Sequence, residues 1–331
     1  MAVMEECVQT AQPVVVLGAT GFVGKAVVSA LEMRGFTVSQ VRAPRIGRWS
    51  GTDINQGVMD YKQMSEQLAE DFSGAATVVN AAGNPDASAK DRDLLNATNG
   101  VLPGVIAKAA SIAGVPRIVH VSSAVVQGNK AILDETQIYH AFSPYAESKI
   151  LGEQAVLEQG EGEVVVYRPP SVHAPDRRVT RRIAKLAKSP LSCVASPVDS
   201  PTPQALIENV GDAVAYLATT SQRPPAVVTH PWEGMTTFDL LALLSGGKSP
   251  IVLPRWFCRF LFSTASVVSR FVKQVRPNVR RLEIIWFGQS QAESWLTLSG
   301  WSPTSQRPAW QKLAIQASES KKQSPSHDGE I

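Results

Sequence analysis

The sequence has few cysteines, little excess charge and no metal-ligand spacing, and each shortage argues against a class of protein. Cys7, Cys193 and Cys258 are widely separated and form no CxxC pair. We therefore expect neither a disulfide scaffold nor a thiolate zinc site, and a reducing compartment fits this cysteine usage best. The five histidines show no metal spacing either, so we expect no metal. The formal charge of +3 lacks the basic surplus typical of nucleic-acid-binding proteins, and we expect no nucleic-acid partner.

Long apolar runs are also missing. The amino-terminal residues include Glu5 and Glu6 where an export signal would be basic, and the first apolar run, 14–17, is too short for an export core. The most apolar later region, 251–272, is interrupted by one proline and three arginines, whereas a spanning helix needs about 20 nearly unbroken apolar residues. We therefore expect no transmembrane segment and a cytoplasmic location. A basic amphipathic helix at 254–275 leaves a peripheral membrane contact open.

Apolar material is nevertheless plentiful, since 44% of the 331 residues are hydrophobic and 18% are charged. Between residues 13 and 168, short β-branched runs alternate with helical patterns. This alternation predicts an α/β fold with a doubly wound parallel sheet, covered by helices on both faces. The expected strands lie at 14–17, 37–41, 77–79, 117–121 and 163–167, and the expected helices include 22–34, 64–70, 101–113 and 145–158.

The chain becomes proline-rich and less regular after Arg168. A helix at 210–219 and a short strand at 227–229 resume the earlier pattern, so we expect this segment to return to the first lobe. The prediction is a first lobe of residues 13–168 plus about 206–230, and a smaller, interleaved second lobe of 169–205 and 231–315. Residues 316–331 are expected to form a disordered tail.

A GxxGxxG loop lies directly between the first expected strand and the first expected helix. Gly18 permits the tight turn, Gly21 lets backbone N–H groups approach a pyrophosphate, and Gly24 lets the helix pack closely on the strand. No GK(S/T) follows, which excludes a P-loop nucleotide triphosphatase. The loop makes the first lobe a Rossmann-type NAD(P)-binding domain, with expected contacts from Gly18, Thr20, Gly21, Phe22, Val23 and Gly24.

The end of the second strand bears on the choice of cofactor. An acidic residue there would suit the ribose 2′-hydroxyl of NAD(H), but this sequence has Arg42 and Arg45 and no acid. NADP(H) is therefore favoured over NAD(H), with a solvated loop charge as the alternative. Asp60, followed by Tyr61, is placed to accept from the adenine amino group or to cap a helix.

Tyr145 and Lys149 form a YxxxK pair, which a helix would place on one face. Because an unperturbed tyrosine has a pKa of about 10, a neighbouring ammonium would help it to transfer a proton near neutrality. Ser122 and Ser123 follow an expected strand at the sheet edge where ligands bind in open α/β folds. A serine there can hold the oxygen with which Tyr145 exchanges a proton.

Over residues 13–315 the chain resembles the extended short-chain dehydrogenase/reductase family, the NAD-dependent epimerase/dehydratase group. The resemblance rests on the glycine loop, the 80–83 segment (Asn80-Ala81-Ala82-Gly83), the YxxxK pair, Arg168-Pro169 and the 123–128 segment, which matches the family's SATVYG-like stretch and selects Ser123 over Ser122. Two segments depart from the family: 168–175 lacks its tyrosine and glycine, and 206–209 reads Leu-Ile-Glu-Asn. Both normally line the substrate side.

The resemblance implies Ser123, Tyr145 and Lys149 as catalytic residues. It also matches Asn96, within Asn96-Ala97-Thr98-Asn99-Gly100, to the family's helix asparagine near the cofactor. Further implied cofactor contacts are Asn80, Ala81, Ala82, Gly83, Asn99, Pro169 and Val172, and implied substrate contacts are Ser123, His173, Arg178 and Arg182.

The basic segment 175–188 resembles that of sugar 4-epimerases and 4-ketoreductases, so the expected substrate is a nucleotide sugar. The resemblance also leaves a homodimer open. Two other functions stay open. One is an NADP-dependent reductase of an apolar alcohol or ketone, similar to 3β-hydroxysteroid dehydrogenases or flavonoid reductases, with residues 253–271 lining its pocket. The other is a non-catalytic NADP(H)-binding regulator.

Overall fold

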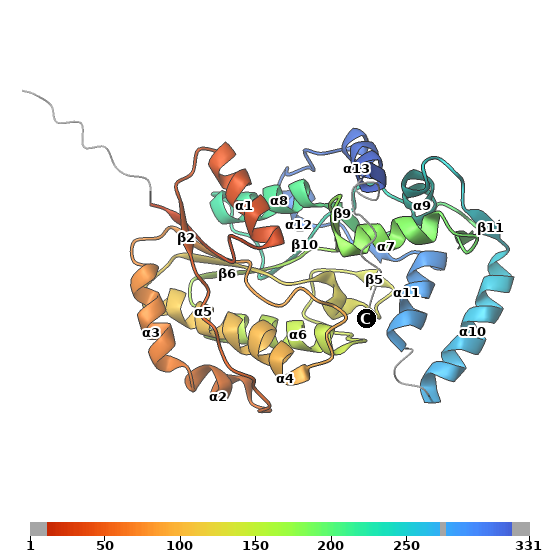
Figure 1. The fold of residues 1–331 in the computed structure, drawn as a ribbon. Helices are drawn as coiled ribbons and strands as arrows, with labels where there is room; N and C mark the ends of the chain where they lie inside the picture. Colours follow the sequence, from red (N-terminus) through yellow and green to blue (C-terminus); the bar gives the residue numbers. More distant parts are fainter. Residues whose placement is uncertain (1–11, 272–275, 320–331) are drawn as a thin grey trace, which may run out of the picture.

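A six-stranded parallel sheet forms the centre of the larger lobe (Figure 1). The structure is a computed structural model and describes residues 12–271 and 276–319. The strand order is β10-β6-β4-β3-β1-β2, and every pairing is parallel, as the sequence predicts. The strands are β1 (Val14–Leu17), β2 (Val38–Val41), β3 (Thr77–Asn80), β4 (Arg117–Val121), β6 (Glu163–Arg168) and β10 (Val227–Thr229).

Helices cover both faces of this sheet, which confirms the doubly wound fold. One face packs against α1 (Phe22–Met33) and α8 (Ile207–Thr219), and the other against α3 (Lys62–Asp71), α5 (Leu102–Ile112) and α6 (Pro144–Gln159). Shorter elements connect them: α2 (Ile54–Met59), α4 (Arg92–Leu95), the π-helix η1 (Asn96–Val101) and the 3₁₀ helix η2 (Ala124–Gln127).

The second lobe has its own apolar core. Buried Leu240, Leu241 and Trp310 lie at its centre, and a second cluster around Cys258 joins α10 to α11. Its helices are α7 (Arg178–Ala187), α9 (Thr237–Ser245), α10 (Arg255–Phe271), α11 (Arg276–Phe287) and α13 (Arg307–Glu319). Three parallel strand pairs complete it: β7 (Ser171–His173) with β9 (Gln204–Leu206), β8 (Cys193–Ala195) with β11 (Ile251–Leu253), and β5 (Ile132–Leu133) with β12 (Ser290–Gln291).

The lobes are interleaved along the chain. Residues 207–229 supply strand β10 to the large sheet and helix α8 to one of its faces. Helix α12 (Trp295–Leu298) also joins the first core through Leu296. Helix α13 continues to Glu319, so residues 316–319 are helical and not part of a disordered tail. Residues 320–331 lie outside the described residues. No helix in the described part of the chain is long and apolar enough to cross a membrane.

The carboxyl ends of the central strands meet at one edge. Leu17 lies opposite Asn80, which lies opposite His120, so the segments that follow β1, β3 and β4 are neighbours. The chain runs from β1 to β2 on one side and then to β3 on the other, so the sheet changes winding direction between β1 and β3. Such a switch point is where open α/β sheets bind ligands.

Candidate active site

The glycine loop forms a cradle that leaves no space for larger residues. Gly18 has φ +76°, and a Cβ at this position would lie 2.7 Å from the Ala81 carbonyl carbon. A Cβ at Gly24 would lie 2.0 Å from the Gly18 oxygen. Gly21 begins α1 without a side-chain cap, and the first turn of α1 carries no acid. The loop and the positive end of the helix therefore fit a dinucleotide pyrophosphate.

The segment after β3 is fixed beside this loop. The Ala81 N–H donates to the Leu17 oxygen at 3.0 Å, and the Ala82 N–H donates to Asn80 Oδ1 at 3.0 Å. Asn80 Nδ2 lies 3.2 Å from His120 Nδ1. Burial, and secondarily the charge of Lys149, holds the pKa of His120 well below its usual 6.5. His120 is therefore a neutral core residue that supports the site.

Asn99 lies against the helix that carries Tyr145. Its Nδ2 donates to Ser148 Oγ on α6 at 3.2 Å, and its Oδ1 accepts from the Asn84 N–H at 2.8 Å. Asn96 instead ends α4. Both asparagines belong to the π-helix η1, and π-helical turns are frequent at functional sites. The hydrogen bond with Ser148 places Asn99 in contact with the helix that carries Tyr145.

The two serines after β4 have different partners. The Ser122 hydroxyl donates to the Glu153 carboxylate, whereas Ser123 Oγ accepts from the Val125 N–H at 3.4 Å and caps η2. Among the described residues, the Ser123 hydroxyl finds no acceptor for its own proton. Ser123 can therefore donate to a substrate oxygen, and Ser122 is committed to Glu153.

Glu153 holds a buried ion pair beneath these serines. Arg168 Nη2 lies 2.6 Å from Glu153 Oε2, and both side chains are fully buried. Arg168 Nη1 also donates to the Thr136 oxygen at 2.7 Å. Glu153 is not among the site residues predicted from the sequence. It nevertheless follows Tyr145 and Lys149 at the same four-residue interval and thus lies on the same face of α6.

Burial shifts the pKa of both residues of the YxxxK pair. Lys149 Nζ donates to the Val121 oxygen at 2.9 Å, and burial lowers its pKa to about 8 against the opposing charge of Glu153. Burial raises the pKa of Tyr145 to about 12, and the nearby Arg177 guanidinium opposes this rise. The Arg177 guanidinium, which lies outside the motif predicted from the sequence, thus favours the Tyr145 phenolate.

Arg177 connects the phosphate loop with the catalytic helix. Its guanidinium carbon lies 4.1 Å from the centroid of the Phe22 ring, and its buried Nε has no hydrogen-bond partner. Arg177 lies just before α7, directly after the 168–175 segment that departs from the family pattern. An unpartnered buried donor between Phe22 and Tyr145 is suited to an anion.

The predicted substrate contacts divide into two groups. His173 is fully buried, with Nδ1 3.0 Å from Thr180 Oγ1 and Nε2 2.7 Å from Gln204 Oε1, so both ring nitrogens are engaged within the protein. Burial lowers its pKa to about 4. Arg178 and Arg182 are exposed on α7, and their charges reach Asp86, whose pKa is lowered mainly by its hydrogen bonds with Ser88.

The remaining predicted cofactor contacts lie on three separate segments of the chain. Pro169 is buried and its oxygen accepts from the Ala124 N–H at 2.9 Å, while Val172 packs against the first core. Asp60 is exposed at the end of α2 and accepts from Gln56 Nε2 at 2.8 Å, and Tyr61 is partly buried beside it. Arg42 and Arg45, both exposed, line a hollow of about 380 Å³ after β2 with Ala43 and Pro44.

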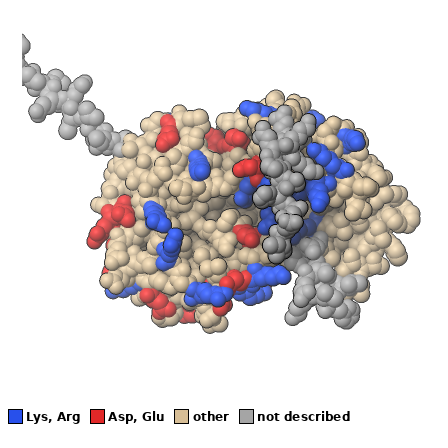
Figure 2. Space-filling model, in the orientation of Figure 1, with Lys and Arg blue, Asp and Glu red and all other residues tan. Residues whose placement is uncertain are grey.

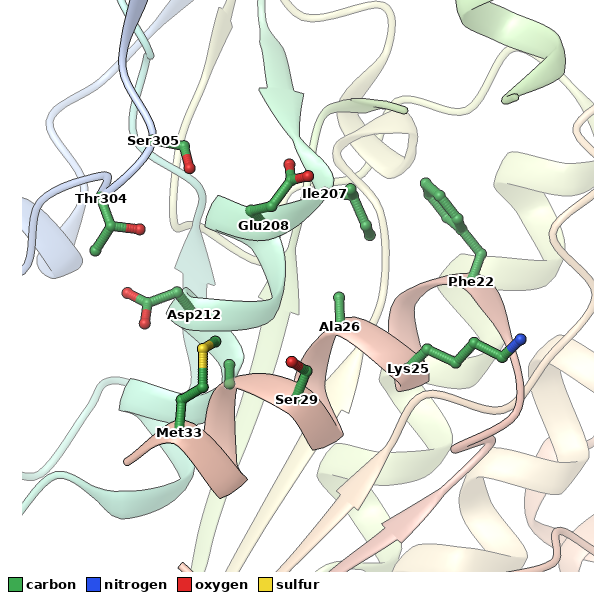
Figure 3. Close-up of a pocket in the computed structure, with 11 residues that line it drawn as sticks. Phe22, Lys25, Ala26, Ser29, Met33, Ile207, Glu208, Asp212, Thr304 and Ser305 are labelled. Carbon is green, nitrogen blue, oxygen red and sulfur yellow. The ribbon is translucent and has the colours of Figure 1, made fainter. Parts of the chain in front are cut away.

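A larger pocket of about 510 Å³ lies elsewhere, between α1, α8 and residues 304–305 (Figure 3). It shares only Phe22 with the predicted site, and none of the catalytic residues lines it. The apolar residues 253–271 also lie away from the cleft, because Trp256 and Phe260 are exposed on α10 at the far end of the second lobe (Figure 1). The expectation that this segment lines a substrate pocket is therefore wrong for these two aromatic residues. Among the described residues, no cluster of His, Cys, Asp or Glu could hold a metal.

Comparison with known proteins gives one family and a set of similar folds. A model of the NAD dependent epimerase/dehydratase family matches residues 14–194. No curated protein sequence matches the chain.

Several solved structures share the fold. MoeE5 in complex with UDP-glucose and NAD is 19% identical with a TM-score of 0.60, covering 93% of this chain and 99% of that one. UDP-glucuronic acid 4-epimerase from Bacillus cereus, with NAD, is 18% identical with a TM-score of 0.60 and covers 94% and 99%. dTDP-4-dehydrorhamnose reductase from Bacillus anthracis, with NADP, is 17% identical with a TM-score of 0.56 and covers 93% and 99%.

Proposed function

Because the chain belongs to the NAD dependent epimerase/dehydratase family, and is therefore a nicotinamide-dependent enzyme of the extended short-chain dehydrogenase type, we propose that it acts at C4 of the sugar of a nucleotide sugar, as a 4-epimerase or a 4-ketoreductase. The observation that carries this proposal is the uncommitted hydroxyl of Ser123, at the sheet edge that also holds the glycine loop and the Tyr145–Lys149 helix. The similar folds with UDP-glucose and with 4-epimerase or reductase activity support the substrate class.

Tyr145 is the group that we propose to move the proton. In the oxidative direction its phenolate takes the proton of the sugar 4-hydroxyl, and in the reductive direction its phenol returns a proton to the carbonyl oxygen. Ser123 donates a hydrogen bond to the same oxygen and orients it. A bound nicotinamide supplies the hydride acceptor or donor. Lys149, held by the Val121 carbonyl, and Arg177 contribute the positive charge that favours the phenolate.

Clustered arginines support an anionic substrate. Burial, and secondarily the charge of Arg182 on α7, lowers the pKa of Arg281 on α11. Arg178 faces the same side, since both it and Arg182 reach Asp86. Figure 2 shows Lys and Arg side chains gathered along the boundary between the lobes. A diphosphate suits arginines in this segment, because its oxygens bind guanidinium groups in pairs.

NADP(H) is the cofactor that we propose, on the strength of Arg42 and Arg45 at the hollow after β2. The test compares dissociation constants for NADPH and NADH in the wild type and in Arg42→Ala and Arg45→Ala. Loss of a charged hydrogen bond to the 2′-phosphate should weaken NADPH binding about 10- to 100-fold and leave NADH binding unchanged. Equal losses for both cofactors would contradict the preference.

The reaction is tested by turnover with a panel of UDP-sugars and dTDP-4-keto sugars, beside sterol-like ketones. Tyr145→Phe should abolish turnover while cofactor still binds. Ser123→Ala should lower kcat by about 100-fold or more, since a directed hydrogen bond to the reacting oxygen is lost. Turnover of the apolar ketones alone would favour the reductase of apolar alcohols. Cofactor binding without any turnover would favour the regulator.

Two coarser properties remain proposals. We propose a homodimer, by analogy with nucleotide-sugar enzymes, which sedimentation velocity tests directly. A cytoplasmic location is supported by the sparse, unpaired cysteines and is tested by cell fractionation. The predicted membrane contact through residues 254–275 includes residues 272–275, which lie outside the described residues.

A further inference from the structure

Helix α10 exposes several large apolar side chains at the end of the second lobe farthest from the large sheet (Figure 1). Trp256 is 72% exposed, Phe260 62% and Val267 52%, and these positions follow one another along one side of the helix. Phe257 and Leu261 flank this row and are exposed as well. We call these five residues the α10 outer face.

The opposite side of α10 explains why the helix is held in this position. Cys258 and Phe262 pack into a cluster with Leu282 and Trp286 of α11. The aromatic residues of the outer face are thus not needed to pack α10 against the lobe, because the opposite side of the helix already does so. The neighbouring strand β11 extends the exposed apolar surface through Ile251 and Val252. Apolar surface of this extent on a soluble lobe marks an interaction site.

Charge identifies the chemistry of the partner. Between Asp239 and Glu283 the sequence has eight Lys and Arg residues and no acidic residue. Arg259 is exposed on α10 itself, and Arg255, at the start of the helix, lies over the Phe287 ring at 5.4 Å. Arginine beside exposed Trp256 and Phe260 suits a partner that is negatively charged at its surface and apolar beneath.

A second copy of this chain does not fit that requirement. A two-fold symmetric contact brings the same patch of both copies together, so Arg259 would approach a region that also lacks acid. A peptide that binds in a groove does not fit either, because α10 is an outward-facing helix (Figure 1).

We propose that the α10 outer face docks on an anionic lipid surface, with the helix lying in the plane of the interface. Helices of this kind place Trp, Phe and Leu at the boundary of headgroups and acyl chains and keep arginine among the headgroups. The 17 residues of α10 span about 25 Å, enough to lie along the surface. The contact adds a location to the enzyme and does not depend on which nucleotide sugar it uses.

Co-sedimentation of the full chain with vesicles tests the proposal. The wild type should bind vesicles of phosphatidylcholine with phosphatidylglycerol, bind pure phosphatidylcholine vesicles at least about tenfold more weakly, and be released by salt. Trp256→Ala/Phe260→Ala should lower partitioning at least about tenfold. Arg259→Glu should lower it about tenfold on the anionic vesicles only.

The matched control removes exposed apolar side chains from the other lobe. Met33→Ala/Leu298→Ala, at positions 80% and 68% exposed, should bind vesicles as the wild type does. NADPH binding serves as the check that every variant is folded. Equal vesicle binding by the wild type and the Trp256→Ala/Phe260→Ala variant would overturn the proposal. So would a wild-type dimer that this variant converts to monomer without any vesicle binding, because a second copy would then cover the face.

Discussion

Replacing Glu153 with Gln removes one charge from the ion pair beneath the site and keeps the shape of the side chain. Arg168 binds both carboxylate oxygens, with Nε 3.0 Å from Oε1 and Nη2 2.6 Å from Oε2, and neither side chain reaches solvent. The variant leaves the guanidinium buried without a counter-charge. Breaking a buried pair in this way costs about 3–5 kcal/mol.

The same substitution has an electrostatic effect on catalysis. The charge of Glu153 raises the pKa of Lys149, which burial has lowered to about 8. Without that carboxylate the Lys149 pKa falls further, so a larger fraction of the ammonium is neutral at pH 7 and less positive charge supports the Tyr145 phenolate. We therefore expect lower turnover at pH 7 in addition to lower stability.

Thermal and chemical unfolding measure the first effect. A loss of about 3–5 kcal/mol corresponds to a fall in Tm of roughly 4–7 °C for a chain of this size. The matched control is Glu147→Gln on the same helix, which breaks the half-exposed pair with Arg92 and should cost less than about 1 kcal/mol. Equal changes for the two variants would refute the reasoning. Adding Arg168→Met to Glu153→Gln should restore part of the stability, because the unpaired charge is then gone.

Three further predictions follow from the site. Arg177→Gln should move the alkaline limb of the kcat/KM profile to higher pH, because the guanidinium holds the pKa of Tyr145 down; an unmoved limb would remove Arg177 from the site. His173 binds fewer protons folded (pKa about 4) than unfolded (about 6.5), so stability should fall as pH drops from 6.5 to 4, and His173→Gln should flatten that dependence in denaturant titrations. Gly24→Ala should abolish cofactor binding in fluorescence titration, while Gly47→Ala, whose Cβ would meet only a hydroxyl at 3.8 Å, should retain it.

The sequence was sufficient for the features that depend on local pattern. The buried strand before Gly18, the glycine loop and the YxxxK spacing each follow from periodicity or from a conformation that only glycine adopts, and the structure contains the same strand, loop and helix. The choice between Ser122 and Ser123 came from the family resemblance. The structure now gives that choice a physical reason, because the carboxylate of Glu153 occupies Ser122.

Other features depend on three-dimensional register and could not be predicted in this way. The segment with Asn96 and Asn99 forms the π-helix η1, which no sequence pattern predicts, and the Asn99 amide donates to Ser148 on α6. His173 belongs to a motif on the substrate side, but its ring nitrogens are engaged by Thr180 on α7 and by Gln204 on β9. Arg177 acquires its place only when α7 is packed beside the phosphate loop.

The charge distribution shows the same limit of sequence reasoning. The sequence concentrates basic residues in 168–188 and 255–281, which indicates one anion site in the second lobe. In the structure some of these basic residues are buried and others are exposed. Arg168 is paired with Glu153 beneath the site, Arg177 lies over the Phe22 ring, and Arg182 is exposed on α7.

Arg255 and Arg259 lie instead on α10, at the end of the second lobe farthest from the large sheet (Figure 1). The proposed diphosphate and the proposed anionic surface would therefore be separate partners for one basic half. Cofactor and substrate binding should then depend on Arg177 and Arg182 at any vesicle concentration, while vesicle binding should depend on Arg259 and not on Arg177 or Arg182.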